Sequence, residues 1–161
     1  MTIPLPVGPV PLVAQNFFAV LAGLLLGPLW GAASVLAFIL IGALGFPVFS
    51  AGRGGIAHLA GPTGGYIAGY LVAAIVAGLF ARRRGKVSSI LGAVSGFIVI
   101  LALGVLRLKL LRNVDWAKAL AAGVLPFLIG DAIKAALASF VSISLGPFVD
   151  SLTRRKKSDG S

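Results

Sequence analysis

The feature that most constrains this chain is a series of long apolar segments. Residues 87–106, for example, form a run of 20 residues without a single Asp, Glu, Lys or Arg. A helix of about 20 apolar residues crosses the hydrocarbon core of a bilayer, and in that core only helices or closed barrels satisfy the backbone hydrogen-bonding groups. The segments therefore predict an all-α integral membrane protein, a bundle of transmembrane helices.

Composition supports the same class. Hydrophobic residues make up 58% of the chain and charged residues 11%, whereas about a quarter of the residues in soluble domains are charged. The length allows one transmembrane domain, residues 1–161, of about five helices. The net charge of +10 does not indicate a nucleic-acid partner, because the basic residues cluster at the ends of apolar segments, where membrane topology and anionic headgroups explain them.

Five apolar segments are the expected helices: residues 12–26, 29–44, 63–81, 87–106 and about 125–145. Gly27 and Pro28 separate the first two, which are expected to form a tight helical hairpin. Gly146 and Pro147 are expected to end the last helix.

The connecting segments differ in character. Residues 1–11 are rich in proline, and residues 45–62 are expected to form a long Gly-rich loop. Residues 115–122 are expected to form a short surface helix. Residues 150–161 are a basic tail, which is expected to be disordered.

Basic residues indicate how the chain is oriented in the membrane. Residues 82–86 and 154–157 carry eight basic residues and are expected on the cytoplasmic side, which leaves loop 45–62 facing outward. Four basic residues do not fit this orientation, because they would lie on the outer side: Arg107, Lys109, Arg112 and Lys118. These side chains either extend to the interface or attract an anionic solute.

Two charges, Asp131 and Lys134, interrupt an otherwise apolar stretch at residues 125–138. Ionisable groups at such depth are costly, so they usually face a partner, a cavity or a substrate. Their i, i+3 spacing puts both on one helix face, where they either contact one bound molecule together or pair structurally with each other or with Gln15. Asn16 is expected to be a polar group at a helix interface, and His58 to be solvated or packed in a loop.

Several stretches, taken in order, resemble the BioY family, the biotin-binding S components of energy-coupling factor transporters. They are Pro9-Val10-Pro11 with Gln15, Leu21 to Pro28, Gly45-Phe46-Pro47-Val48-Phe49, Gly61-Pro62-Thr63-Gly64-Gly65-Tyr66, and Gly123 to Phe127 with Gly130, Asp131 and Lys134. The resemblance implies a high-affinity biotin-binding subunit in the cell membrane of a prokaryote. It would capture biotin outside for import powered by separate subunits.

The resemblance also implies how biotin would be held. Asp131 would accept a ureido N–H, and Lys134 would donate to the ureido carbonyl or pair with the carboxylate. Apolar walls would come from four aromatic residues, Phe46, Phe49, Tyr66 and Tyr70. Backbone N–H groups at Thr63, Gly64 and Gly65 would hold the carboxylate, unless Thr63 only caps the helix, and the Gln15 amide would contact either the ligand or another helix.

Family members are similar to one another in having six helices, the first of which precedes the Pro9-Val10-Pro11 stretch. This chain begins where that helix would end, and the parity of its spans agrees. Either an upstream helix is missing, through a misassigned start codon or a truncation, or the protein has five spans. The implied partners are a transmembrane scaffold subunit and two ATPase subunits of an energy-coupling module.

Other functions receive less support from the residues. An S component or small carrier for a different vitamin would keep the cavity and change its polar contacts. A membrane enzyme is not expected, because the chain has no Cys, no Glu and one His, and no cofactor or metal is expected either. A pore is not expected, since no segment has a continuous polar face.

Overall fold

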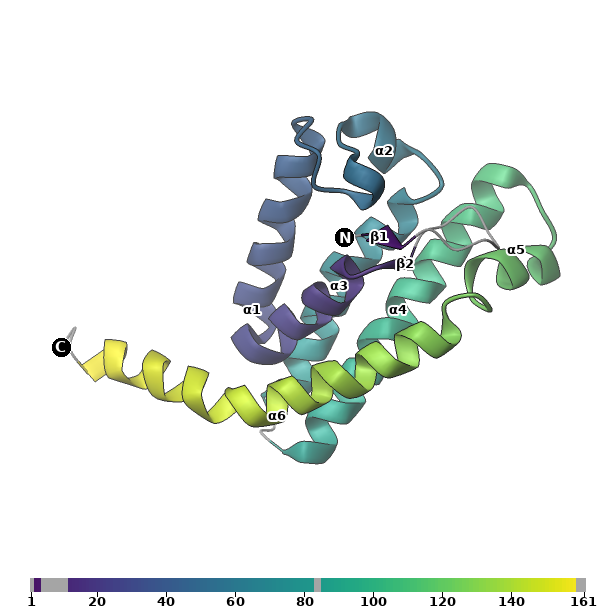
Figure 1. The fold of residues 1–161 in the computed structure, drawn as a ribbon. Coiled ribbons are helices and arrows are strands. Elements are labelled where there is room, and N and C mark those ends of the chain that lie inside the picture. Colours follow the sequence, from purple (N-terminus) through teal and green to yellow (C-terminus); the bar gives the residue numbers. More distant parts are fainter. Residues whose placement is uncertain (1, 4–11, 83–84, 159–161) are drawn as a thin grey trace.

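The computed structural model describes residues 2–3, 12–82 and 85–158, and this part of the chain is almost entirely helical (Figure 1). In chain order the elements are β1 (Thr2–Ile3), β2 (Leu12–Val13), α1 (Gln15–Ala43), η1 (Ser50–Gly52), α2 (Ile56–Ala60), α3 (Gly64–Ala81), α4 (Lys86–Arg112), α5 (Trp116–Gly123) and α6 (Leu128–Ser158). The predicted helical bundle is confirmed. The antiparallel pair β1–β2 was not predicted, and most of the Pro-rich residues 1–11 lie outside the described residues.

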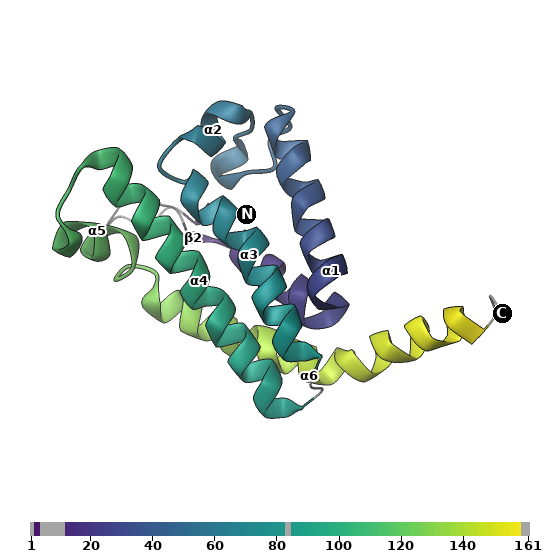
Figure 2. The same ribbon diagram turned by 180° about the vertical axis from the view of Figure 1, so that it is seen from behind.

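Helix α1 is bent into two arms, and the bend lies at the predicted break. Gly27 has φ 80° and ψ 178°, which is not a helical conformation and which glycine adopts without steric cost. Pro28 follows inside the helix and has no N–H to donate to the preceding turn. Figures 1 and 2 show the two arms diverging from this point, with the second arm leading up to α2.

Helix α3 lies between α1 and α4 and forms the centre of the bundle (Figure 2). Its core positions are small: Ala73, Ala74 and Ala77 have no exposed surface. The backbone of α1 approaches so closely that a Cβ on Gly23 would lie 2.2 Å from the carbonyl oxygen of Ala74. Small residues at helix interfaces allow such close packing in membranes, where packing and not the hydrophobic effect holds helices together.

The predicted Gly-rich loop 45–62 contains two short helices, η1 and α2, which were not predicted. Phe49 is 2% exposed and lies against Gly42, where a Cβ would meet its ring. The N–H of Gly55 donates to the carbonyl of Gly42 over 2.7 Å. The loop is therefore attached to the end of α1 by both packing and hydrogen bonds.

Helix α4 extends past the predicted end at residue 106 to Arg112, because Leu, Arg and Lys are good helix formers. It ends at Asn113, which has φ 48°, a left-handed conformation common after helix ends. The predicted short surface helix is confirmed as α5.

Two expectations about the end of the chain were wrong. Helix α6 does not end at Gly146 and Pro147 but continues to Ser158, so most of the tail 150–161 is helical (Figure 1). Proline fits the dihedral angles of a helix and removes only one of its hydrogen bonds, so a helix can bend through it. The last residues, 159–161, lie outside the described part of the chain.

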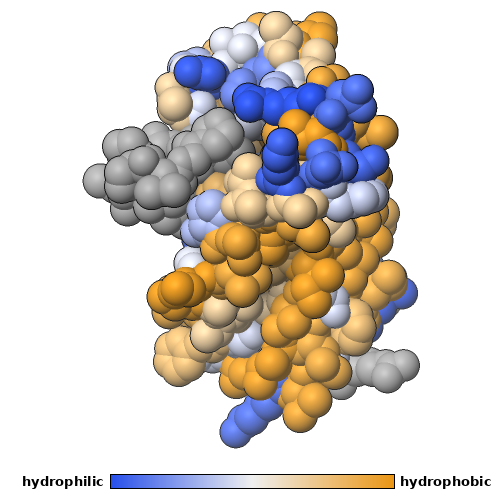
Figure 3. All heavy atoms as spheres, turned by 90° about the vertical axis from the view of Figure 1, so that its right-hand side faces the viewer, coloured by the Kyte–Doolittle hydropathy of each residue, from blue (hydrophilic) through white to orange (hydrophobic). Residues whose placement is uncertain are grey.

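Four helices of the described chain are long and apolar enough to cross a membrane: Gln15–Ala43, Gly64–Ala81, Lys86–Arg112 and Leu128–Val149. The two arms of α1 count here as one helix. With the arms counted separately, these four helices correspond to the five predicted apolar segments. Figure 3 shows a broad hydrophobic band below a hydrophilic cap on one side of the molecule. Loop 45–62 and the first residues of α4 lie at opposite ends of the bundle (Figure 1).

Two of the basic residues predicted on the outer side contact the protein itself. Arg107 Nη2 donates to the carbonyl of Ala60 over 2.7 Å, which ties α4 to α2. Lys109 Nζ lies 4.6 Å from the centroid of the Trp116 ring, a cation–π contact between α4 and α5. These contacts give both cations a structural partner near the end of α4.

Replacing Gly23 with alanine is expected to destabilise the bundle, because the new methyl group would collide with the α3 backbone. Overpacking of this kind costs about 1–3 kcal/mol. Gly146→Ala is the matched control, since a Cβ at Gly146 meets nothing within 4 Å and alanine favours helix. Thermal unfolding in one detergent should give a lower Tm for Gly23→Ala and an equal or higher Tm for Gly146→Ala. A Gly23→Ala Tm at or above that of the control would contradict the close α1–α3 contact.

Candidate functional site

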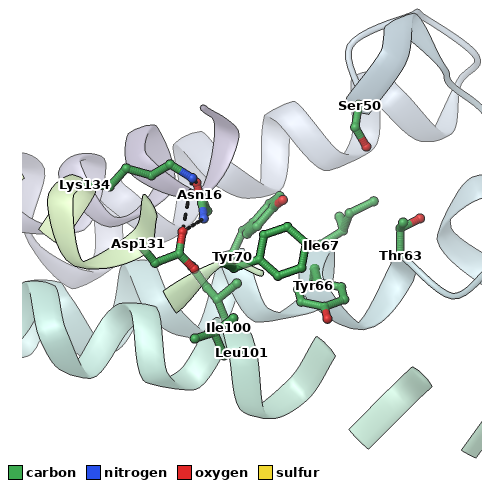
Figure 4. A pocket seen from close by; sticks show the side chains of 11 residues that line it. Asn16, Ser50, Thr63, Tyr66, Ile67, Tyr70, Ile100, Leu101, Asp131 and Lys134 are labelled. Carbon is green, nitrogen blue, oxygen red and sulfur yellow. Dashed lines mark hydrogen bonds and ion pairs between the residues drawn. The ribbon is translucent and has the colours of Figure 1, made fainter. Parts of the chain in front are cut away.

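Asp131, Lys134 and Asn16 form a buried polar network between α6 and α1 (Figure 4). Asn16 Nδ2 donates to Asp131 Oδ1 over 2.9 Å. Lys134 Nζ lies 3.1 Å from Asp131 Oδ1 and 3.1 Å from Asn16 Oδ1. The predicted pairing of Asp131 with Lys134 is confirmed, but the amide that joins them is Asn16 and not Gln15.

Because Asp131 and Asn16 are buried, their polar atoms must find hydrogen-bond partners within the protein. Asp131 is 5% exposed and Asn16 is 6% exposed. An uncompensated carboxylate at such a position would be very unfavourable, and a cation together with a hydrogen-bond donor offsets most of that cost. The network therefore fixes the start of α6 against the start of α1.

A small cavity of about 30 Å³ adjoins the network. We call it the loop-side cavity; it is lined by Asn16, Ser50, Thr63, Tyr66, Ile67, Tyr70, Ile100, Leu101, Phe127, Asp131 and Lys134. In Figure 4 the rings of Tyr66 and Tyr70 lie between the charged pair at one end and Thr63 at the other. The cavity thus has a charged end, an aromatic and aliphatic middle, and a hydroxyl end close to the loop.

Tyr66 connects this cavity to the α5–α6 junction. Its hydroxyl donates to the carbonyl of Gly123 over 2.9 Å, and its ring lies 6.4 Å from that of Phe127. The ring also fills the space above Gly104 of α4, where a Cβ would collide with it. Tyr66 is therefore held in place by α4, by α5 and by the connection between α5 and α6, which makes it a rigid wall.

Half of the predicted site residues line the loop-side cavity: Asp131, Lys134, Thr63, Tyr66 and Tyr70. The other five have other positions. Gln15 Nε2 donates to the carbonyl of Val48 over 2.6 Å and so holds the loop, and Phe46 is 58% exposed. Phe49 supports the loop from beneath, as described above.

Gly64 and Gly65 lie outside the lining and serve close packing. A Cβ on Gly65 would lie 2.4 Å from Cβ of Arg107, and the N–H of Gly64 already donates to the carbonyl of Gly61. Thr63 does not cap α3 with its side chain, so the capping alternative is wrong. Its hydroxyl instead lies 3.2 Å from His58 Nε2.

His58 belongs to the packed part of the loop, as one of the two sequence alternatives predicted. Its ring stacks on that of Phe49, with centroids 5.4 Å apart. Burial and, secondarily, the charge of Arg53 lower the pKa of His58 below its ordinary value. Both effects favour the neutral ring, whose Nε2 lies within hydrogen-bonding distance of the Thr63 hydroxyl.

Sequence reasoning missed six of the lining residues: Asn16, Ser50, Ile67, Ile100, Leu101 and Phe127. Asn16 carried the clearest signal, because a buried amide within an apolar helix requires partners. Which partner it takes depends on the approach of α6, over a hundred residues away along the chain. Ser50 and Phe127 reach the cavity only because η1 and the α5–α6 junction fold over it.

Comparison with known proteins identifies the family. The model of the BioY family matches residues 1–151. A protein of Pyrococcus horikoshii named as a probable biotin transporter BioY is 48% identical over 136 residues, which cover 84% of this chain and 80% of that protein. The biotin transporter BioY of Thermotoga maritima is 39% identical over 144 residues, covering 89% of this chain and 85% of that protein.

A solved structure agrees in fold. The S-component for biotin from an ECF-type ABC transporter matches with a TM-score of 0.82 and 32% identity, over 89% of this chain and 79% of that one. These findings confirm the resemblance and the S-component fold predicted from the sequence. They also confirm a transport protein in place of an enzyme. The chain belongs to the BioY family.

Proposed function

We propose that this chain is the biotin-capturing S component of an energy-coupling factor uptake transporter. The observation that carries the proposal is the buried Asp131–Lys134–Asn16 network at one end of the loop-side cavity. Intramembrane charges beside a cavity are functional by default. The relatives named above supply the identity of the ligand.

The chemistry of biotin matches the order of groups along this cavity. Its ureido ring has two N–H donors and one carbonyl, which suit the carboxylate of Asp131 and the ammonium of Lys134. Its thiophane ring and alkyl chain are apolar and suit the rings of Tyr66 and Tyr70. Its carboxylate then lies toward Thr63 and the loop, where water and hydroxyl groups solvate it.

Binding requires the cavity to enlarge. A volume of about 30 Å³ holds about two water molecules, which is far less than a biotin molecule needs. Loop 45–62 closes the cavity through Ser50, so movement of this loop is the simplest route of entry. In the network, a ureido N–H would replace the Asn16 amide on Asp131, so the carboxylate exchanges one donor for another and is never left unpaired.

Transport would require further subunits. The chain contains no nucleotide-binding motif, so the energy would come from two ATPase subunits through a transmembrane scaffold subunit. The basic turn at residues 82–86 would face the prokaryotic cytoplasm and loop 45–62 the outside. The cavity would thus collect its ligand from the external side of the cell membrane.

Removing either charge is expected to abolish tight binding. Loss of one partner of a buried, hydrogen-bonded charge pair costs about 2–5 kcal/mol. Asp131→Asn and Lys134→Met should therefore weaken biotin binding at least about 30-fold in isothermal titration of detergent-purified protein. Asp115→Asn, outside the cavity, is the matched control and should bind like the parent. If the folded parent fails to bind biotin, the ligand is a different vitamin, which a ligand screen would identify.

Gln15→Ala is expected to accelerate exchange of biotin while leaving the polar contacts intact. It removes one hydrogen bond that holds the loop, which is worth about 0.5–1.5 kcal/mol, so dissociation should become about 2–13 times faster. Release of radiolabelled biotin would measure this rate. The control is Ser34→Ala, which removes a hydrogen bond to Trp30 on the exposed face of the same helix. A loss of affinity as large as that of Asp131→Asn would instead show that Gln15 contacts biotin directly.

A further inference from the structure

A second cavity lies at the opposite end of the bundle, where all four long helices meet. We call it the basic-end cavity. Its volume is about 380 Å³, more than ten times that of the loop-side cavity. The residues that matter here are Gly27 of α1, Arg82 after α3, Lys86 and Ser89 of α4, and Ser142 and Gly146 of α6.

Glycines keep this cavity open. Gly27, Gly85 and Gly146 all line it, and a Cβ on any of them would meet nothing within 4 Å. Nearby Gly78, in contrast, has no room for a side chain, because a Cβ there would lie 2.4 Å from the backbone of Pro28. The bundle is therefore tightly packed directly beside the open space where the four long helices meet.

The wall of the cavity offers unused hydrogen-bonding capacity. Ser89 and Ser142 are 9% and 6% exposed, and their hydroxyl oxygens lie 3.4 Å apart, which is long for such a pair. Each hydroxyl can donate once and accept twice. Pro147 has no N–H, so the carbonyl of Ile143, also in the lining, lacks its helical donor. The hydroxyl that accepts within this pair can still donate its own proton, and both oxygens and the Ile143 carbonyl can accept from a ligand.

The charge at the rim is positive. Arg82 and Lys86 are exposed, and none of the described residues that line the cavity is acidic. Lys86 is also the first residue of α4, whose N-cap residue Gly85 provides no side-chain cap. The positive end of the α4 dipole therefore adds to the two cations.

We propose that the basic-end cavity binds a phosphate group that carries a hydroxyl-bearing substituent. The phosphate lies between Arg82 and Lys86, and the substituent extends over Ser89 and Ser142. An anionic phospholipid such as phosphatidylglycerol has this chemistry, and so does a free phosphate ester such as glycerol phosphate. The basic turn favours the lipid, because this end of the bundle is expected at the cytoplasmic leaflet, where anionic headgroups are concentrated.

Native mass spectrometry of the full chain in detergent tests this site. Phosphatidylglycerol or phosphatidylcholine is added, and the fraction of protein that retains one lipid is measured. We expect retention of phosphatidylglycerol alone. It should fall about 30-fold in the Arg82→Gln/Lys86→Gln variant, because each of the two charges contributes about 1 kcal/mol near the membrane surface. Gly146→Leu, whose Cβ would meet nothing within 4 Å, adds a large side chain to the lining and should reduce retention as well.

The control variant is Arg112→Gln/Lys118→Gln, which removes the same charge at the other end of the bundle and should retain the lipid like the parent. Biotin titration of each variant confirms folding and separates this site from the loop-side cavity. Stabilisation of the parent by glycerol phosphate without lipid, lost in Arg82→Gln/Lys86→Gln, would assign the site to a free ester. Equal lipid retention by the parent and Arg82→Gln/Lys86→Gln, or equal losses in both double variants, would overturn the proposal. If Gly146→Leu does not fold, the difference in lipid retention between the two double variants tests the proposal by itself.

Discussion

The structure depends on the neutralisation of Asp131 inside the membrane. A carboxylate at this depth needs both an opposite charge and a donor, and Lys134 and Asn16 supply them. Since Lys134 comes from the same helix and Asn16 from α1, the network joins the last span to the first. It also determines where a polar ligand can exchange hydrogen bonds within an otherwise apolar bundle.

Packing in the bundle is uneven, and the unevenness locates both cavities. Helices α1, α3 and α4 approach at backbone distance through small residues such as Gly23, Ala74 and Gly78. Helix α6 packs less closely against α1 and α4 and contributes to both cavities, through Asp131 at the loop side and Ser142 at the basic end. A rigid three-helix core with a more loosely packed fourth helix suits a protein that must open around a ligand without unfolding.

Loop 45–62 is more than a flexible cover. Two of the candidate ligand-binding residues, Gln15 and Phe49, hold the loop in this structure, one by a hydrogen bond to Val48 and the other by packing on Gly42. His58 and Thr63 continue this chain of contacts to the edge of the loop-side cavity. Gln15 and Phe49 therefore hold the loop in place without lining the loop-side cavity.

The sequence by itself determined the membrane class, the break at Gly27 and Pro28, the limits of α3 and α5, and the pairing of Asp131 with Lys134. These features follow from local hydropathy, from proline and glycine chemistry, and from the cost of a charge in lipid. The sequence-based prediction of the end of α6 was wrong, because a proline can bend a helix without ending it. Only the tertiary structure decided that Asn16 and not Gln15 reaches Asp131. Neighbouring residues on a helix point in different directions, and which of them meets a partner depends on how two distant helices cross.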